Sequence, residues 1–205
     1  MKLGYKITKN NNQIEIQRNT KETKIIVILN NIKNKKLNVE TNLEFLNHMI
    51  ETLAWNANLN IGVKIDTNTK LRHPIAEDAG ITLGRGFLEF YKIKIKNGIE
   101  GNGFSRGIID EAYSDTAISI EGRSYCFIEI PYFENVEDVN NFDLKAFLEG
   151  FTQGCRCTLQ IRSNGKDPHH TWEAVFRSLG QAIRKALKSN NWRKNTIIGL
   201  KGTLE

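Results

Sequence analysis

The stretch Asp167-Pro168-His169-His170-Thr171-Trp172-Glu173 opens the strongest helical pattern in this chain of 205 residues. Asp167 is a favourable N-cap residue, because its carboxylate can accept a hydrogen bond from a free backbone amide of the first turn. Pro168 suits the first helical position, where its missing N–H costs nothing. Apolar residues then recur at helical spacing, namely Trp172, Val175, Phe176, Leu179, Ala182, Ile183, Ala186 and Leu187. The pattern predicts an amphipathic helix.

Two histidines and a glutamate share one face at the start of this helix. His169 lies four residues before Glu173 and His170 lies three before it, and both spacings make side chains neighbours on a helix. Imidazole nitrogens with one carboxylate oxygen are ligands that suit a borderline divalent ion. A pair of histidines at a helix start is equally compatible with ordinary polar surface, so the spacing alone leaves both interpretations open.

A second copy of the pattern lies about 100 residues earlier, which indicates an internal repeat. In 73–84 a histidine precedes a glutamate by four residues, and Leu-Gly follows that glutamate by six and seven; 169–180 repeats these intervals. A Phe-Leu pair stands upstream of each copy, at 45–46 and at 147–148. We therefore expect two similar half-domains, residues 1–97 with an extra N-terminal hairpin and residues 98–205.

Each half is predicted to run strands, helix, strand, helix. Further helices are expected at 43–57, at about 73–91 and at 142–154, and strands are expected at 24–29, 37–41, 59–65 and 157–162. Gly80 and Gly84 inside the second helix indicate close packing against another backbone. The expected fold class is α+β, in which each half has a β-sheet with helices on one face and the helices pack between the two sheets.

Two connections carry their own expectations. Four glycines in 98–107 favour a flexible loop, which either closes over a ligand or only connects elements. The apolar runs 117–120 and 125–130 flank Glu121-Gly122-Arg123-Ser124, and they read as the two strands of a hairpin.

Composition narrows the class of protein. No apolar run reaches the roughly 18–20 residues of a membrane span, and no signal peptide is recognised, so we expect a cytoplasmic protein without a membrane. The net charge of +6 lies on scattered lysines and is not interleaved with aromatic residues, which argues against nucleic acid as a partner. A small anionic ligand such as a phosphate explains a few convergent basic residues equally well. Three cysteines, an odd number, favour reduced thiols.

Several motifs, in their order and spacing, resemble those of imidazoleglycerol-phosphate dehydratase over nearly the whole chain. They are Arg18-x-Thr20-Lys21-Glu22-Thr23, Phe45-x-x-His48-Met49, His73-x-x-x-Glu77-Asp78-x-Gly80-Ile81-x-Leu83-Gly84, Asp110-Glu111-Ala112, Gly122-Arg123, His169-His170-x-x-Glu173-Ala174-x-Phe176 and Lys201-Gly202-Thr203-Leu204. The resemblance implies a lyase that removes water from imidazole glycerol phosphate in histidine biosynthesis. It also implies a homo-oligomer of 24 subunits, with active sites between subunits that hold Mn²⁺, as one or two ions per site, or another divalent metal.

The same resemblance assigns roles to individual residues. The metal ligands that it implies are His48, His73, Glu77, His169, His170 and Glu173. The carboxylates placed in the catalytic set are Glu22, Glu77 and Glu173, with Glu22 contacting substrate and acting in proton transfer. The residues placed against the phosphorylated substrate are Arg123, Arg177, Lys201 and Arg106.

The chain departs from the family pattern at ligand positions. Pro74 replaces a second histidine in the first copy, and Gln160 stands where the family has a histidine in a strand. Only four histidines occur in the chain, so two complete family-type metal sites require water or Gln160 as a substitute. Three hypotheses stay open: a dehydratase with a reduced metal centre, a divergent paralogue acting on another small phosphorylated or imidazole-like substrate, and a non-catalytic ligand-binding assembly of the same fold.

Overall fold

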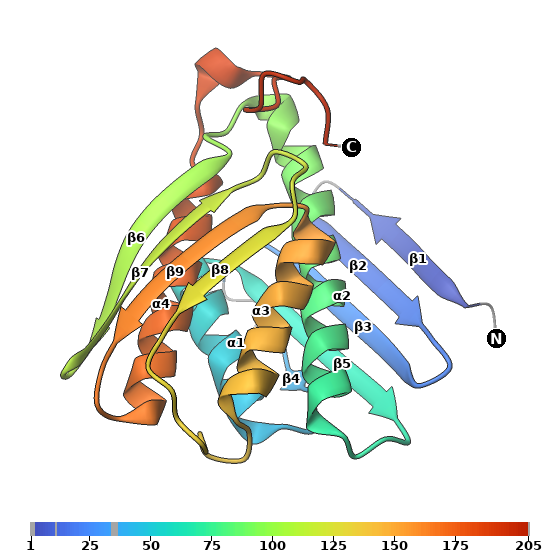
Figure 1. Cartoon of the computed structure of the whole chain (residues 1–205). Coiled ribbons are helices and arrows are strands. Elements are labelled where there is room, and N and C mark those ends of the chain that lie inside the picture. The colour runs from blue at the N-terminus through green and yellow to red at the C-terminus, as the bar shows by residue number, and fades with distance from the viewer. Residues whose placement is uncertain (1–2, 11, 34–36, 205) are drawn as a thin grey trace.

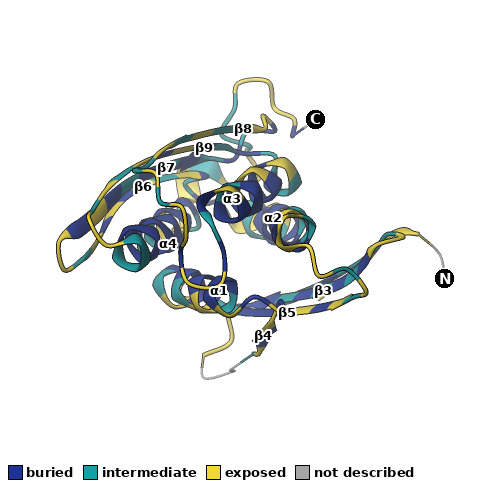
Figure 2. Ribbon diagram, turned by 60° about the horizontal axis from the view of Figure 1, so that its bottom comes forward, coloured by how far each residue is buried: buried dark blue, intermediate teal, exposed yellow. Residues whose placement is uncertain are grey.

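The computed structural model describes residues 3–10, 12–33 and 37–204, which form two β-sheets with four α-helices between them (Figure 1). Figure 2 shows the helices between the sheets, with buried residues, in dark blue, where helices and sheets face one another. This arrangement confirms the expected α+β class and the two similar halves. None of the helices in the described ranges is long and apolar enough to cross a membrane.

The first sheet has the strand order β1-β2-β3-β5-β4. Its strands are β1 (Gly4–Lys9), β2 (Gln13–Asn19), β3 (Thr23–Asn30), β4 (Val39–Glu40) and β5 (Asn60–Thr67). β1, β2, β3 and β5 pair antiparallel, whereas β4 lies parallel to β5. The expected N-terminal hairpin is the β1–β2 pair, although residue 11 in its turn lies outside the described residues.

The second sheet repeats this plan with the order β6-β7-β9-β8. Its strands are β6 (Asn102–Ile109), β7 (Ala112–Ser119), β8 (Tyr125–Glu129) and β9 (Thr158–Asn164). β6, β7 and β9 pair antiparallel and β8 lies parallel to β9, as β4 does to β5. The order β2-β3-β5-β4 in the first half therefore corresponds to β6-β7-β9-β8 in the second, as the sequence repeat predicts.

The four helices are α1 (Glu44–Ala57), α2 (Arg72–Lys94), α3 (Asn141–Cys155) and α4 (Pro168–Ala186). Short 3₁₀ turns follow α2 and α4, at η1 (Ile95–Asn97) and η2 (Asn191–Arg193). α2 packs on α3 and α1 packs on α4, so each helix pair joins the two halves. Large apolar side chains fill the space between the helices and the sheets, among them Trp172, Phe147 and Phe176, which are fully buried.

Glycines set the close approach of α2 and α3, as expected from Gly80 and Gly84. A Cβ atom at Gly80 would lie 2.0 Å from the carbonyl oxygen of Phe147, and one at Gly84 would lie 2.1 Å from that of Phe151. α3 contributes Gly150 and Gly154 to the same contact: Cβ atoms added there would lie 2.5 Å and 2.1 Å from carbonyl oxygens of α2. The two backbones are therefore in direct contact, and no side chain fits between them.

Two local expectations were wrong. Residues 102–107 of the expected loop belong to β6, because their glycines serve close packing instead of flexibility: a Cβ atom at Gly103 would lie 2.1 Å from the carbonyl oxygen of Ala182 in α4. The expected hairpin of 117–120 with 125–130 does not form either. β9 lies between β7 and β8, and β8 reaches the sheet edge as a parallel strand before the chain crosses over through α3.

Candidate metal centre

The N-terminus of α4 is fixed as its sequence predicts. Asp167 is the N-cap, and its Oδ1 accepts a hydrogen bond of 2.9 Å from the backbone N–H of His170. Pro168 occupies the first turn. This capping sets where the helix begins, and it therefore sets the directions in which His169, His170 and Glu173 point.

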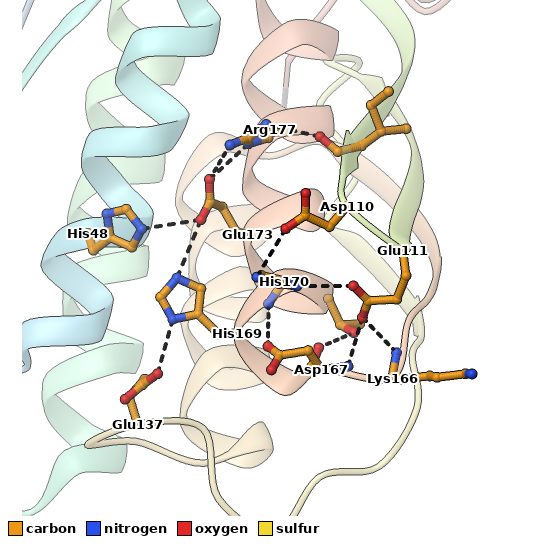
Figure 3. Close-up of polar contacts among 12 residues, drawn as sticks. His48, Asp110, Glu111, Glu137, Lys166, Asp167, His169, His170, Glu173 and Arg177 are labelled. Atoms are coloured by element: carbon orange, nitrogen blue, oxygen red, sulfur yellow. Dashed lines mark hydrogen bonds and ion pairs between the residues drawn. The ribbon is translucent and has the colours of Figure 1, made fainter.

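His169 and Glu173 meet His48, which reaches them from α1 in the other half of the chain (Figure 3). The Nε2 atoms of His48 and His169 each lie 3.4 Å from Oε2 of Glu173. The three donor atoms lie within 4.8 Å of one another. No other cluster of three or more potential metal-ligand side chains occurs in the described ranges. Two imidazole nitrogens and a carboxylate oxygen can hold a divalent ion.

Arg177, one helical turn after Glu173, is hydrogen-bonded to the second oxygen of that carboxylate. Its Nε and Nη2 atoms donate to Oε1 of Glu173 over 2.9 and 2.5 Å, which leaves Oε2 facing the two histidines. Burial alone would raise the pKa of Glu173, but the Arg177 guanidinium, with a smaller effect of His48, lowers it below its ordinary value. These contacts favour the ionised form of Glu173 and leave its Oε2 directed at the candidate site.

His170 points away from this group. Its Nδ1 lies 3.0 Å from Oε2 of Glu111, and its Nε2 lies 3.6 Å from Oδ2 of Asp110 (Figure 3). Glu111 also accepts the backbone N–H of Asp167, and this bond with that from His170 lowers the pKa of Glu111 to about 2. The bond to Glu111 raises the pKa of His170. A turn between β6 and β7 thus holds the second histidine of the pair.

The other expected residues of the first half, His73, Glu77 and Glu22, lie outside the group around His48. His73 and Glu77 are exposed on the first turns of α2, and neither belongs to the group around His48. Glu22 lies in the β2–β3 turn. That turn is held against α2, because Thr23 donates a hydrogen bond of 2.5 Å to Asp78 and Arg18 forms an ion pair of 2.6 Å with it.

Arg123 and Lys201, which we expect to bind the phosphate, are both exposed. Lys201 belongs to the C-terminal tail, which lies at the top of Figure 1, and Arg123 follows Gly122, which packs against Leu204 of that tail. Arg156 joins the two segments that carry them. Its Nε donates to the carbonyl oxygen of Leu204 and its Nη2 donates to that of Gly122, both over 2.8 Å. Arg123 and Lys201 therefore lie in a different region of the chain from the His48 group.

A cavity of about 590 Å³ lies directly beside the His48 group. Its lining includes His48, Glu173, Arg177, Arg106 and the exposed indole of Trp55. Arg106, on β6, pairs with Asp115 on the neighbouring strand over 2.8 and 2.6 Å. Arg106 and Arg177, both expected to bind substrate, thus border the candidate site and already have carboxylate partners within the chain.

The departures from the family pattern lie elsewhere. Pro74 is in the first turn of α2, where no side-chain donor replaces the missing histidine. Gln160 is exposed on β9 and borders a different cavity, with Phe104 and Thr158. Neither position contributes to the group at His48.

Two residues around this site carried no recognisable signal in the sequence. Glu137 and Asp138 belong to the loop 131–140 before α3, and no motif or helical spacing includes them. Oε1 of Glu137 lies 3.0 Å from Nδ1 of His169. Asp138 accepts the backbone N–H groups of Glu44 and Phe45 over 2.7 and 2.9 Å, and so caps α1, whose own N-cap residue provides no side-chain bond.

The fold and this group together define a class: a duplicated α+β protein with a histidine–carboxylate site between its halves. Comparisons with known proteins specify the family. The sequence profile of imidazoleglycerol-phosphate dehydratase (IGPD) matches residues 41–183. The chain belongs to the imidazoleglycerol-phosphate dehydratase family.

Individual relatives from this family match the chain over almost its full length. The chain is 34% identical over 195 residues to the imidazoleglycerol-phosphate dehydratase of Acinetobacter baumannii strain SDF, covering 93% of this chain and 95% of the relative. It is 32% identical to that of Hydrogenovibrio crunogenus, covering 94% and 99%. A crystal structure of IGPD from Pyrococcus furiosus is 30% identical and superposes with a TM-score of 0.77, covering 91% of this chain and 98% of that one.

Proposed function

We propose that this chain dehydrates imidazole glycerol phosphate as a metal-dependent hydro-lyase of histidine biosynthesis. The observation that carries the proposal is the convergence of His48, His169 and Glu173 from both halves of the chain, with donor atoms within 4.8 Å of one another. The names of the relatives, which span nearly the same length, support the substrate. The sequence repeat predicts the fold, but a fold alone does not identify a reaction, so the functional proposal depends on the site.

The donor set fits a divalent ion, Mn²⁺ or another of similar preference. His48 and His169 would provide nitrogen atoms, and Glu173 would provide Oε2, because Arg177 already holds Oε1. A bound ion would supply Lewis-acid stabilisation of negative charge as a proton leaves the carbon beside the substrate ring. With three protein donors in one chain, the site keeps positions for substrate or for further ligands.

The other residues have roles that follow from their chemistry. Arg123 and Lys201 are cations suited to the phosphate group, and the Arg156 bonds hold their two segments together. Glu22 is an exposed carboxylate on a turn that Asp78 fixes, so it is a candidate for the proton transfer. His73 and Glu77 complete the proposed ligand set from the first half.

These groups lie apart within one chain, which supports active sites formed between subunits. We propose a cytoplasmic homo-oligomer, of 24 subunits as the family resemblance implies, in which α2 of one chain faces the His48 group of another. The separation of His73 and Glu77 from His48 in the described structure is the physical reason. A single chain would offer only part of the donor set.

One observation favours an alternative function. Pro74 and Gln160 remove two donors that the family pattern provides, and Arg177 stands where that pattern has lysine. A divergent paralogue acting on another small phosphorylated or imidazole-like substrate, or a non-catalytic assembly of this fold, would tolerate these changes.

The test combines metal content with turnover. The purified full chain is incubated with Mn²⁺, freed of excess ion, and assayed for bound manganese per chain and for formation of imidazole acetol phosphate. We expect one or two ions per chain and product formation, both lost in His169→Ala. Trp192→Ala, which removes an exposed aromatic ring in η2, is the control and should leave both unchanged.

The outcomes separate the hypotheses. Bound manganese without product would overturn the dehydratase assignment and favour the divergent paralogue. A folded, assembled protein that binds no manganese and forms no product would leave only the non-catalytic assembly.

A further inference from the structure

The loop 131–140 crosses from the second sheet to α3 and touches three of the helices around the candidate site. Glu137 contacts His169 on α4, Asp138 caps α1, and the carbonyl oxygen of Asp138 accepts a 3.1 Å bond from Arg72 on α2. These are the helices that carry His48, His73 and His169. A two-residue segment thus contacts every helix that provides a candidate ligand.

Glu137 holds an unfavourable backbone conformation. Its φ is 55°, in the left-handed region that favours glycine. A glutamate there costs conformational energy that a glycine would not, so surrounding contacts have to offset it. The contact that the structure gives this side chain is the one with His169.

The geometry of that contact decides which nitrogen of His169 faces the site. Oε1 of Glu137 accepts the hydrogen of Nδ1 over 3.0 Å, and Nε2, on the other side of the ring, lies 3.4 Å from Oε2 of Glu173. A carboxylate on Nδ1 places the proton there and leaves the Nε2 lone pair free to bind a cation. It also fixes the plane of the ring, against which Phe45 packs edge-on with ring centroids 5.0 Å apart.

The neighbouring histidine shows the same arrangement with a different partner. Nδ1 of His170 lies 3.0 Å from Oε2 of Glu111, which comes from the β6–β7 turn. Two consecutive imidazoles are therefore each oriented by a carboxylate from outside α4. Carboxylates that accept a hydrogen bond from a ligand histidine are a recurring way of fixing its tautomer and strengthening its binding to metal.

We propose that Glu137 is a positioning residue that holds the His169 imidazole with Nε2 directed at the metal site. The proposal rests on the metal dependence of the proposed function. It adds a residue that neither the repeat nor the ligand motifs contain, from a loop of the second half that contacts helices of both halves.

The experiment measures the manganese affinity of the full-length protein by competition with a metal-sensitive fluorescent chelator. The melting temperature of each variant is measured as well. Glu137→Gly removes the carboxylate and relieves the backbone cost together. We expect the affinity to fall by about 10- to 100-fold, while the melting temperature of the metal-free protein stays equal or rises. A purely structural role for Glu137 would instead lower the melting temperature and leave the affinity unchanged.

Two controls isolate the contact. Asn195→Gly relieves a similar φ of 58° in the segment after η2 and should not change the affinity. Glu134→Gln removes a carboxylate charge from the same loop and should also have no effect, whereas Glu137→Gln keeps an acceptor oxygen for Nδ1 and should lose less affinity than Glu137→Gly.

If the unchanged protein binds manganese and Glu137→Gly binds it equally well, this inference fails and the proposed function stands. If the unchanged protein binds no divalent ion, the metal dependence and the positioning role fail together.

Discussion

Replacing Gly84 with alanine should force α2 away from α3 and weaken the junction of the two halves. The new methyl carbon would lie 2.1 Å from the carbonyl oxygen of Phe151 and 2.8 Å from the backbone nitrogen of Cys155. Both atoms belong to the α3 backbone, so no side-chain rotation relieves the clash. Restoring an ordinary contact requires the helices to separate locally by about 1 Å.

Two effects of opposite sign determine the magnitude. Alanine is favoured over glycine in a helix interior by about 1 kcal/mol. Overpacking of a tight core costs about 1–3 kcal/mol and occasionally more, and a clash between two backbones belongs at the upper end of that range. We therefore expect a net loss of about 2 kcal/mol, or a fall in melting temperature of about 4–8 °C for a chain of this size.

The assay is thermal unfolding, followed by circular dichroism, of the metal-free protein. One fixed concentration is used, because the midpoint of any protein that assembles depends on concentration. Gly199→Ala is the matched control: its added Cβ atom would meet only Glu121 side-chain atoms at 3.5–3.7 Å, so its midpoint should stay within about 1 °C of the parent. A Gly84→Ala variant as stable as the parent would refute the backbone contact between α2 and α3.

Two further predictions concern polar contacts. Asp138→Ala removes both hydrogen bonds that cap α1 and should lower the free energy of unfolding by about 1–2 kcal/mol in urea titrations; Asp138→Asn, which keeps an acceptor, should lose less, and equal losses would argue against capping. Burial would raise the pKa of Glu89, but its bonds to Lys9 and Lys92 lower it overall. Because the folded pKa is depressed, the stabilisation is present above the ordinary value of 4.5 and is lost as the pH falls below it. Glu89→Gln should therefore cost about 2 kcal/mol at pH 7, and the cost should shrink as the pH falls through the lowered pKa of Glu89. A cost that did not depend on pH would contradict this.

Local signals in the sequence were reliable where short-range physics decides the structure. The cap at Asp167, the proline after it and the apolar stripe beyond predict α4 correctly, because all three act within a few residues. The spacing of His169 and Glu173 predicts their shared face for the same reason. The repeat extends this to the architecture, since two copies of one plan must bury two similar faces.

Contacts between distant segments were outside the reach of such signals. Glycine indicates a loop when read locally, yet Gly103 lies in a strand because α4 approaches it closely. The partner of β8 is β9, which comes after α3, and the adjacent β7 is not its partner. Glu137 belongs to no pattern at all, since its contact with His169 spans 32 positions of the chain.

The placement of Arg123 and Lys201 away from the His48 group has a genetic consequence if the active site closes between neighbouring chains. A chain lacking Glu173 and a chain lacking Arg123 would each be inactive alone, because every site in either assembly would miss one group. In a mixed assembly, some sites would draw the face with the His48 group from one parent and the face with Arg123 from the other. Two defective alleles would then complement each other in one cell, whereas two alleles damaged on the same face would not.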